Sequence, residues 1–97
     1  MPVGLCLIEL RFPNAMSLKD KRRITKSIVD RTRHRFNISI AEVNMQDSLQ
    51  KASLAITTVS NSTPLTQSTL TNVLDFIEST RLDIEVLDYH VDISHPF

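Results

Sequence analysis

Residues 37–60, "NISIAEVNMQDSLQKASLAITTVS", decide the fold of this 97-residue chain. They hold two runs rich in β-branched residues, a composition typical of strands. Only "QDSLQK", residues 46–51, separates the two runs. That is too short for the helical crossover that joins parallel strands, so the segment predicts an antiparallel hairpin.

Upstream of the hairpin, a strand and a helix are predicted. "PVGLCLIELRF", residues 2–12, is apolar at alternate positions on both faces, as a central strand usually is. Ser17 and Asp20 form a start that resembles a capping box, and the helix that follows runs to about Arg35. Asn37 is the residue expected to take the left-handed conformation that ends a helix.

Downstream of the hairpin, the same two kinds of element return. Thr63 is the expected cap of a second helix, and Pro64 suits its first position. This helix should end near Thr80, and "IEVLDYHVDI", residues 84–93, reads as the last strand. The order β-α-β-β-α-β predicts an α+β, ferredoxin-like sandwich over residues 1–97, with a four-stranded antiparallel sheet and both helices on one face.

Composition excludes several functional classes. The single glycine, Gly4, cannot build a phosphate-binding loop, and no G-x-S-x-G elbow exposes a nucleophile. The longest apolar stretch is far below the ~20 residues of a membrane span. The lone cysteine, Cys6, lies in an apolar run and has no partner for a disulfide, which favours a reducing cytoplasm. We therefore expect a cytoplasmic protein that is not an enzyme and holds no cofactor.

Charge is strongly segregated along the chain. Residues 19–35 hold eight of the 11 Lys and Arg residues and two of the 11 acids, so this segment is +6 and the remainder of the neutral chain is −6. A helical wheel places one group of these cations together, opposite the apolar stripe: Lys19, Arg22, Arg23, Lys26 and Arg33. This row indicates a phosphate-binding surface. The other interpretation is a solvated helix face whose C-terminal cations interact with the helix dipole.

Two further patterns have a functional and a structural interpretation. Asp88, His90 and Asp92 share one face of the last strand, which could suit a metal ion but equally suits an edge strand that repels unwanted pairing, and we predict no metal site. The central strands have no aromatic residue except Phe12 at an end. Recognition of RNA bases on the sheet face needs such aromatics, so any RNA contact should come from the first helix.

The sheet face that no helix covers is the second candidate surface. Val3, Leu5 and Leu7 should emerge there, joined by Ile84 and Val86 if Leu87, Tyr89 and Val91 of the last strand point toward the helices. An open apolar patch usually meets a partner, here a second copy in a two-fold dimer, unless the tail with Pro96 and Phe97 folds over it.

Several segments resemble the bacterial YlxP-like family, a domain of unknown function numbered 503. They are "SLKDKRR" (17–23), "RFNISIAEV" (35–43), Gln46 with Asp47, "VSN" (59–61) and "LDFIES" (74–79). The resemblance spans nearly the whole chain and implies a ferredoxin-like fold without established catalytic residues. Genes of this family often lie beside those for translation initiation and ribosome maturation factors, which implies a role near the ribosome. Leu7 departs from the family pattern, in which a basic residue is common.

The sequence thus predicts a non-enzymatic binding protein that contacts structured RNA, ribosomal in the light of the resemblance, through its basic first helix. The alternative is a protein-interaction module, or a homodimer, that uses the open apolar sheet face.

Overall fold

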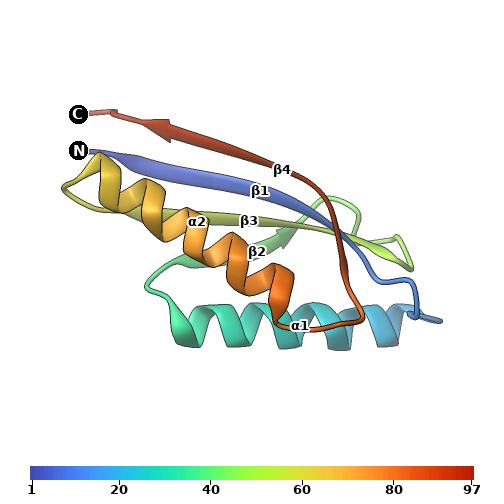
Figure 1. Cartoon of the computed structure of the whole chain (residues 1–97). Coiled ribbons are helices and arrows are strands. Elements are labelled where there is room, and N and C mark those ends of the chain that lie inside the picture. The colour runs from blue at the N-terminus through green and yellow to red at the C-terminus, as the bar shows by residue number, and fades with distance from the viewer.

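The computed structural model describes residues 1–97 as a four-stranded sheet and two helices. The elements, in chain order, are β1 Val3–Arg11, α1 Leu18–Arg35, β2 Ser39–Val43, β3 Lys51–Val59, α2 Thr63–Ser79 and β4 Glu85–Ser94. This β-α-β-β-α-β order confirms the predicted fold class. Figure 1 shows the two helices together on one side of the strands.

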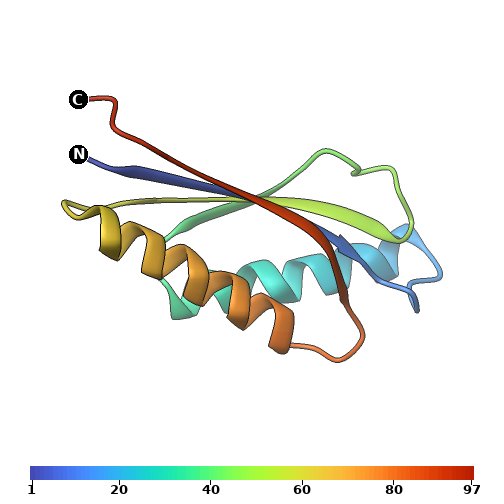
Figure 2. The ribbon, with the colours of Figure 1, turned by 45° about the horizontal axis from the view of Figure 1, so that its top comes forward.

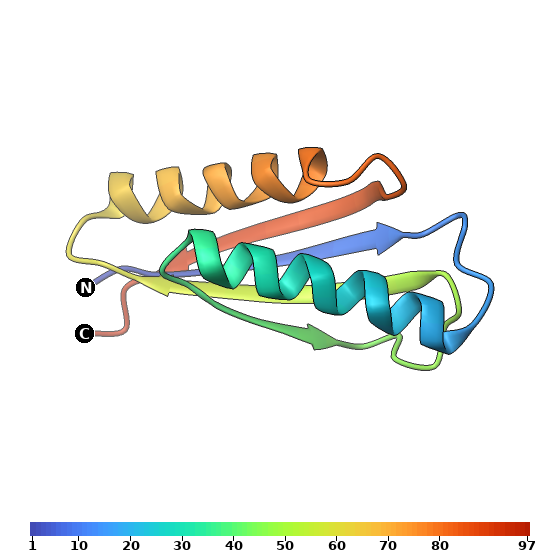
Figure 3. The same cartoon turned by 90° about the horizontal axis from the view of Figure 1, so that it is seen from below.

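The sheet has the order β2-β3-β1-β4, and every neighbouring pair is antiparallel. The predicted hairpin is present as β2 and β3, and β1 and β3 are the two central strands. Figure 2 shows the sheet passing above both helices, and Figure 3, from the helix side, shows α1 lying over the β2 half. The outer strands β2 and β4 each leave one edge unpaired.

Alternation along the central strands divides the sheet into a covered and an open face. In β1 the side chains of Cys6, Ile8 and Leu10 are buried, and they alternate with the more exposed residues of the open face. The core between sheet and helices contains Cys6, Ile8, Leu10, Phe12, Ala15, Ile28, Ile40, Ala52, Leu54, Ile56, Leu70, Val73 and Ile77. Burying each large aliphatic side chain contributes roughly 1.5–3 kcal/mol, so this layer is the main source of stability.

The helix ends partly confirm the predicted caps. The Ser17 hydroxyl accepts a hydrogen bond from the amide of Asp20, as expected, while the Asp20 carboxylate accepts one from the amide of Met16. The prediction for Asn37 is wrong, because α1 ends at Phe36 in an extended conformation. The predicted cap of α2 is wrong by one residue, since Ser62 rather than Thr63 accepts the hydrogen bond from the helix start.

A register shift in β4 corrects the predicted phase of that strand. Tyr89 and Val91 point toward the helices as predicted, but between Glu9 and Leu10 of β1 the register moves, and Leu10 faces Val86 instead of Leu87. Ile84 and Val86 therefore pack against the core and not on the open face, where the sequence pattern had placed them. The physical reason is a β-bulge, which inserts one residue and reverses the alternation beyond it.

Gly4 marks the closest approach of α2 to the sheet. A Cβ atom at this position would lie 2.6 Å from Cγ2 of Thr66 and 2.9 Å from Cδ1 of Leu70. Both of those residues are buried in α2 and cannot move away into solvent. The only glycine of the chain thus lets the first half of α2 sit directly on β1.

We expect Gly4→Ala to destabilise the protein by about 1–3 kcal/mol, because the added methyl group overpacks this contact. Thermal unfolding followed by circular dichroism measures the change. The double variant Gly4→Ala with Thr66→Ser should recover part of the loss, since Ser lacks the Cγ2 methyl but keeps the hydroxyl that lies 2.7 Å from Ser60 Oγ. A Gly4→Ala variant as stable as the wild type would contradict this account of the α2–β1 contact.

Candidate nucleic-acid interface

The predicted cationic row lies on the solvent side of α1. Lys19, Arg22, Arg23, Lys26 and Arg33 are all exposed, and the opposite side of the helix is buried against the sheet. The Ser17 cap fixes where this helix begins, and the spacing of the buried residues fixes its rotation. The structure therefore gathers all five predicted residues on one surface, which we call the α1 basic face.

The members of the α1 basic face differ in their partners. Lys26 Nζ lies 2.8 Å from Asp30 Oδ2 one turn along the helix, and the hydrogen bond from Lys26 lowers the pKa of Asp30. Arg33 donates a hydrogen bond to the backbone carbonyl of Ile40 in β2. Lys19, Arg22 and Arg23 make no side-chain hydrogen bond or ion pair within the protein. These three cations are free to meet an external anion.

Lys21, within the same segment, has a structural role that the sequence pattern did not reveal. Its side chain is 1% exposed, and Nζ lies 3.0 Å from Glu42 Oε2 and 2.6 Å from the carbonyl oxygen of Met45. The geometry suits a hydrogen bond only to the carbonyl, so Glu42 is held by charge attraction. A helical wheel contains the signal for this role, because Lys21 falls in line with the buried residues Thr25 and Ile28.

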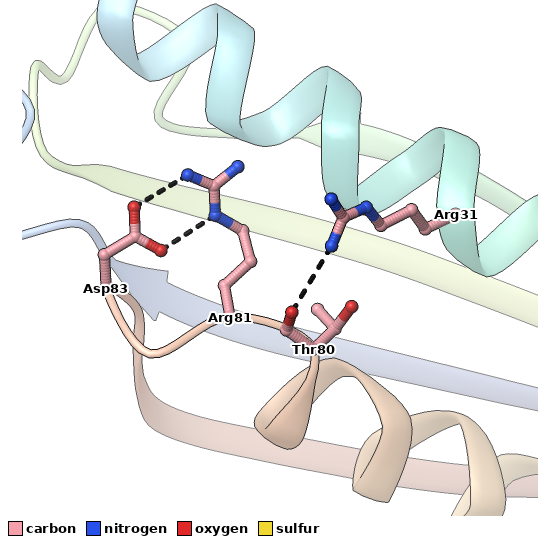
Figure 4. A network of polar contacts seen from close by, with 4 residues as sticks. All are labelled: Arg31, Thr80, Arg81 and Asp83. Carbon is pink, nitrogen blue, oxygen red and sulfur yellow. Dashed lines mark hydrogen bonds and ion pairs between the residues drawn. The ribbon is translucent and has the colours of Figure 1, made fainter.

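The two cations near the end of α1 connect the helix to α2. Arg31 donates a hydrogen bond to the carbonyl of Thr80, beside the paired side chains of Arg81 and Asp83 (Figure 4). The Arg81 guanidinium forms two hydrogen bonds to the Asp83 carboxylate and lowers its pKa. Arg35 stacks over Phe76, with Cζ 5.2 Å from the ring centroid. These contacts account for the cations that lie outside the α1 basic face.

Acidic residues of the second half of the chain form no ion pair with the α1 basic face. Asp75 and Glu78 of α2 line a groove together with Asp88 of β4. None of these three carboxylates forms an ion pair with a cation of α1. Of the acids outside residues 19–35, only Glu42 of β2 pairs with a cation of α1, and that cation is the buried Lys21.

The open face of the sheet contains Val3, Leu5 and Leu7, as the alternation predicts. Leu5 is 48% exposed, and Val59, the last residue of β3, adds a further apolar side chain beside Val3. The tail does not cover this patch with an aromatic ring, because Phe97 is almost fully exposed. The patch is narrower than predicted, since Ile84 and Val86 lie on the other face.

Asp88, His90 and Asp92 share the open face of β4, opposite Glu9, Leu7 and Leu5 of β1. His90 Nε2 lies 3.2 Å from Asp88 Oδ2, and all three residues are exposed. These three side chains do not converge on one point, and no three His, Cys, Asp or Glu residues of the structure are arranged so that they could hold a metal ion. Cys6 is buried, and burial raises the pKa of its thiol, so it is a poor nucleophile.

A groove between α2 and β4 was not expected from the sequence. It has a volume of about 570 Å³, and its apolar lining includes Leu70 and Leu74 of α2 and Leu87, Tyr89 and Val91 of β4. The three β4 side chains point toward the helix side but remain about half exposed. The sequence signal for this groove was the number of apolar residues in β4, which is larger than one helix can cover.

Neither α1 nor α2 combines the length and the hydropathy that a membrane-spanning helix requires.

Comparison with known proteins gives a family and a fold. The model of a family described as "Protein of unknown function (DUF503)" matches residues 3–91. The "Uncharacterized protein YlxP" of Bacillus subtilis (strain 168) is 40% identical over 77 residues, which cover 79% of this chain and 84% of that protein.

Two designed proteins have a similar structure. "De novo designed protein Foldit4" has a TM-score of 0.54 at 11% identity, and the match covers all of both chains. A designed protein "LFR1 1 with ferredoxin fold" has a TM-score of 0.52 at 13% identity, covering 97% of this chain and 83% of that one. At these identities the likeness concerns the fold alone, and it agrees with the ferredoxin-like architecture.

Removal of the Lys21 ammonium should leave the Glu42 carboxylate without its counter-charge. We expect Lys21→Met to destabilise the protein by about 2–4 kcal/mol, toward the lower end for a broken buried pair because the Glu42 side chain is 22% exposed. The double variant Lys21→Met with Glu42→Leu should be more stable than Lys21→Met alone, because no unpaired charge remains. Urea unfolding of the wild type, both single variants and the double variant measures the coupling free energy. Additive single effects would contradict a direct interaction.

Proposed function

The chain belongs to the DUF503 family of proteins of unknown function, and we propose that it is a non-enzymatic protein that binds structured RNA through the α1 basic face. The observation that carries this proposal is the presence of three exposed cations, Lys19, Arg22 and Arg23, that have no acidic partner within the protein. Residues 19–35 carry a net charge of +6 although the whole chain is neutral. That is more positive charge than the helix needs for its own stability.

The shape of the α1 basic face suits a nucleic-acid backbone. At 1.5 Å per residue, Lys19 to Lys26 spans about 10 Å along the helix axis, which is enough to reach more than one phosphate. Each phosphate that a cation neutralises releases counterions, so the affinity should fall steeply with salt concentration. Arg22 and Arg23 add the ability to bind phosphate oxygens in a bidentate manner.

The open sheet face is poorly suited to stacking on RNA bases. The only aromatic residue on β4, Tyr89, points toward the helix side, and Phe12 is fully buried. RNA-binding sheets of this topology stack bases on exposed aromatic residues of the central strands. A contact made by α1 with the backbone of a folded RNA is therefore the better-supported mode. The lone buried cysteine and an RNA partner both agree with a cytoplasmic location.

The alternative function is a protein-interaction module on the open face. Half-exposed Leu5 and the neighbouring Val59 support it. Glu9, Asp88 and Asp92 lie next to this patch and limit its apolar area. The patch is thus better suited to a small contact than to a large obligate interface.

We expect the double variant Arg22→Glu, Arg23→Glu to lower affinity for ribosomal RNA at least tenfold. The slope of log affinity against log salt should fall by about two, because two cations would no longer neutralise a phosphate. Fluorescence anisotropy with a labelled ribosomal RNA fragment, over a series of salt concentrations, measures both quantities. The thermal midpoint should remain close to that of the wild type, because neither side chain has a partner within the fold.

The double variant Arg11→Glu, Lys51→Glu is the matched control. It changes the net charge by the same amount, but Arg11 and Lys51 are directly opposite each other in β1 and β3, on the sheet face that the helices do not cover. Because Arg11 also forms an ion pair with Glu85, the thermal midpoint of this control is measured alongside its affinity. This control should weaken RNA binding much less. Equal losses for the two double variants would show that net charge alone attracts RNA and would overturn the assignment to α1.

A further inference from the structure

β4 is a long edge strand whose regular part, after the bulge at Leu87, is protected against pairing only by the exposed side chains of Asp88, His90 and Asp92 on the open face. It is ten residues long and contains no proline, lysine or arginine, and Figure 1 shows no element beyond it. The other edge strand, β2, has only five residues, and Arg33 occupies the carbonyl of Ile40 on it. Natural sheets usually shorten, charge or cover their edges. β2 is short, whereas β4 is long and carries charge only on its open face, so its helix side leaves Tyr89, Val91 and Ile93 available to a neighbouring strand.

The side chains of β4 also indicate a missing neighbour. Tyr89 is 56% exposed and Val91 is 43% exposed, although both point toward the helix side of the sheet. α2 shares with them the groove of about 570 Å³ and does not cover them. A strand placed next to β4 would contact these side chains from the uncovered side.

We propose that the missing neighbour is β4 of a second copy of this chain, paired antiparallel across a two-fold axis that is perpendicular to the sheet and passes beside Val91. Such an axis keeps the helices of both copies on the same side and joins the two sheets into one. The contact is self-complementary, so it closes as a dimer and does not propagate.

The direction of the backbone groups supports this geometry. The amide of Tyr89 donates a hydrogen bond to the side chain of Asp88 at 2.8 Å, so it points to the free edge and not to β1. Because this direction alternates along a strand, the amides and carbonyls of Val91 and Ile93 also point to the free edge. Pairing Val91 with its copy, and Tyr89 with Ile93, would form about six backbone hydrogen bonds. Asp88 would release the Tyr89 amide to the incoming strand.

Side-chain charges select the register among those that the pleat allows. A pairing centred on His90 places Asp88 opposite Asp92 of the second copy, twice, and like charges directly opposite each other are unfavourable. A pairing shifted by one residue in the N-terminal direction brings Leu87 opposite Val91, and Leu87 lies at the bulge, where the regular ladder is interrupted. Pairings shifted further in the C-terminal direction join fewer residues.

The pairing centred on Val91 avoids both problems. It places His90 opposite Asp92 of the second copy and Asp88 opposite Ser94, so each facing pair combines a donor with a carboxylate. On the helix side it brings Tyr89 against Ile93 and Val91 against its copy, which removes apolar surface from water. The contact is a single strand pair, so we expect a dimer of micromolar affinity.

Sedimentation equilibrium of the full chain, from about 1 μM to 1 mM, tests the proposal. The wild type should show a monomer–dimer equilibrium, and Val91→Lys should raise the dimer Kd at least tenfold because two ammonium groups would face each other. Leu5→Lys is the matched control, since Leu5 is 48% exposed on the open face of the same sheet. It should leave the Kd within a few-fold of the wild type. A monomer throughout the range, or dissociation by Leu5→Lys but not by Val91→Lys, would overturn the proposal.

A cysteine cross-link tests the register independently of affinity. A hydrogen-bonded antiparallel pair has Cα atoms about 5.5 Å apart, within the range that a disulfide bridges. Val91→Cys should therefore form a disulfide-linked dimer under mild oxidation, while Leu87→Cys, on the same strand, should not. The wild type should remain unlinked because Cys6 is buried. Faster cross-linking of Leu87→Cys than of Val91→Cys would exclude this register.

Discussion

The buried contact of Lys21 with Glu42 and the Met45 carbonyl is the constraint on which the functional surface depends. A charged ammonium group in the interior must keep its partners, because an unpaired buried charge costs several kcal/mol. Lys21 is the first of the four buried residues of α1, which together set the rotation of the helix, so that Arg22, Arg23 and Lys26 face solvent. The same contact joins the two segments that carry the family resemblance, "SLKDKRR" and "RFNISIAEV", because Lys21 lies in the first and Glu42 in the second.

The α1 basic face and the free edge of β4 lie at opposite edges of the sheet, so a partner bound to one leaves the other accessible. α1 lies over the β2 half, and the free edge is β4, beyond β1 (Figure 3). A dimer formed through β4 would therefore carry one α1 basic face at each outer end of the joined sheet. Two such faces on one assembly would bind a long RNA with a higher effective affinity than one face alone, provided that the RNA spans the distance between them.

The fold itself carries little information about function. Two designed proteins share it at 11% and 13% identity, and the same α+β sandwich supports many unrelated activities. Function here must be argued from features that the fold does not require, such as unpaired cations on a helix or apolar side chains exposed on an edge strand. A stable sandwich needs neither Arg22 and Arg23 without acidic partners nor Tyr89 and Val91 half exposed.

The sequence by itself determined the order of the elements, the hairpin, the central position of β1 and the cationic side of α1, since these follow from local periodicity and charge. The sequence could not locate the bulge at Leu87, because a bulge depends on how β4 pairs with β1. For this reason the sequence pattern predicted the wrong sheet face for Ile84 and Val86. Glu42, the partner of Lys21, lies in β2, beyond the end of α1. The exposure of Tyr89 and Val91 depends on how much of the strand β4 is covered by the helix α2. These are relations between segments remote in sequence, and only the tertiary structure brings such segments together.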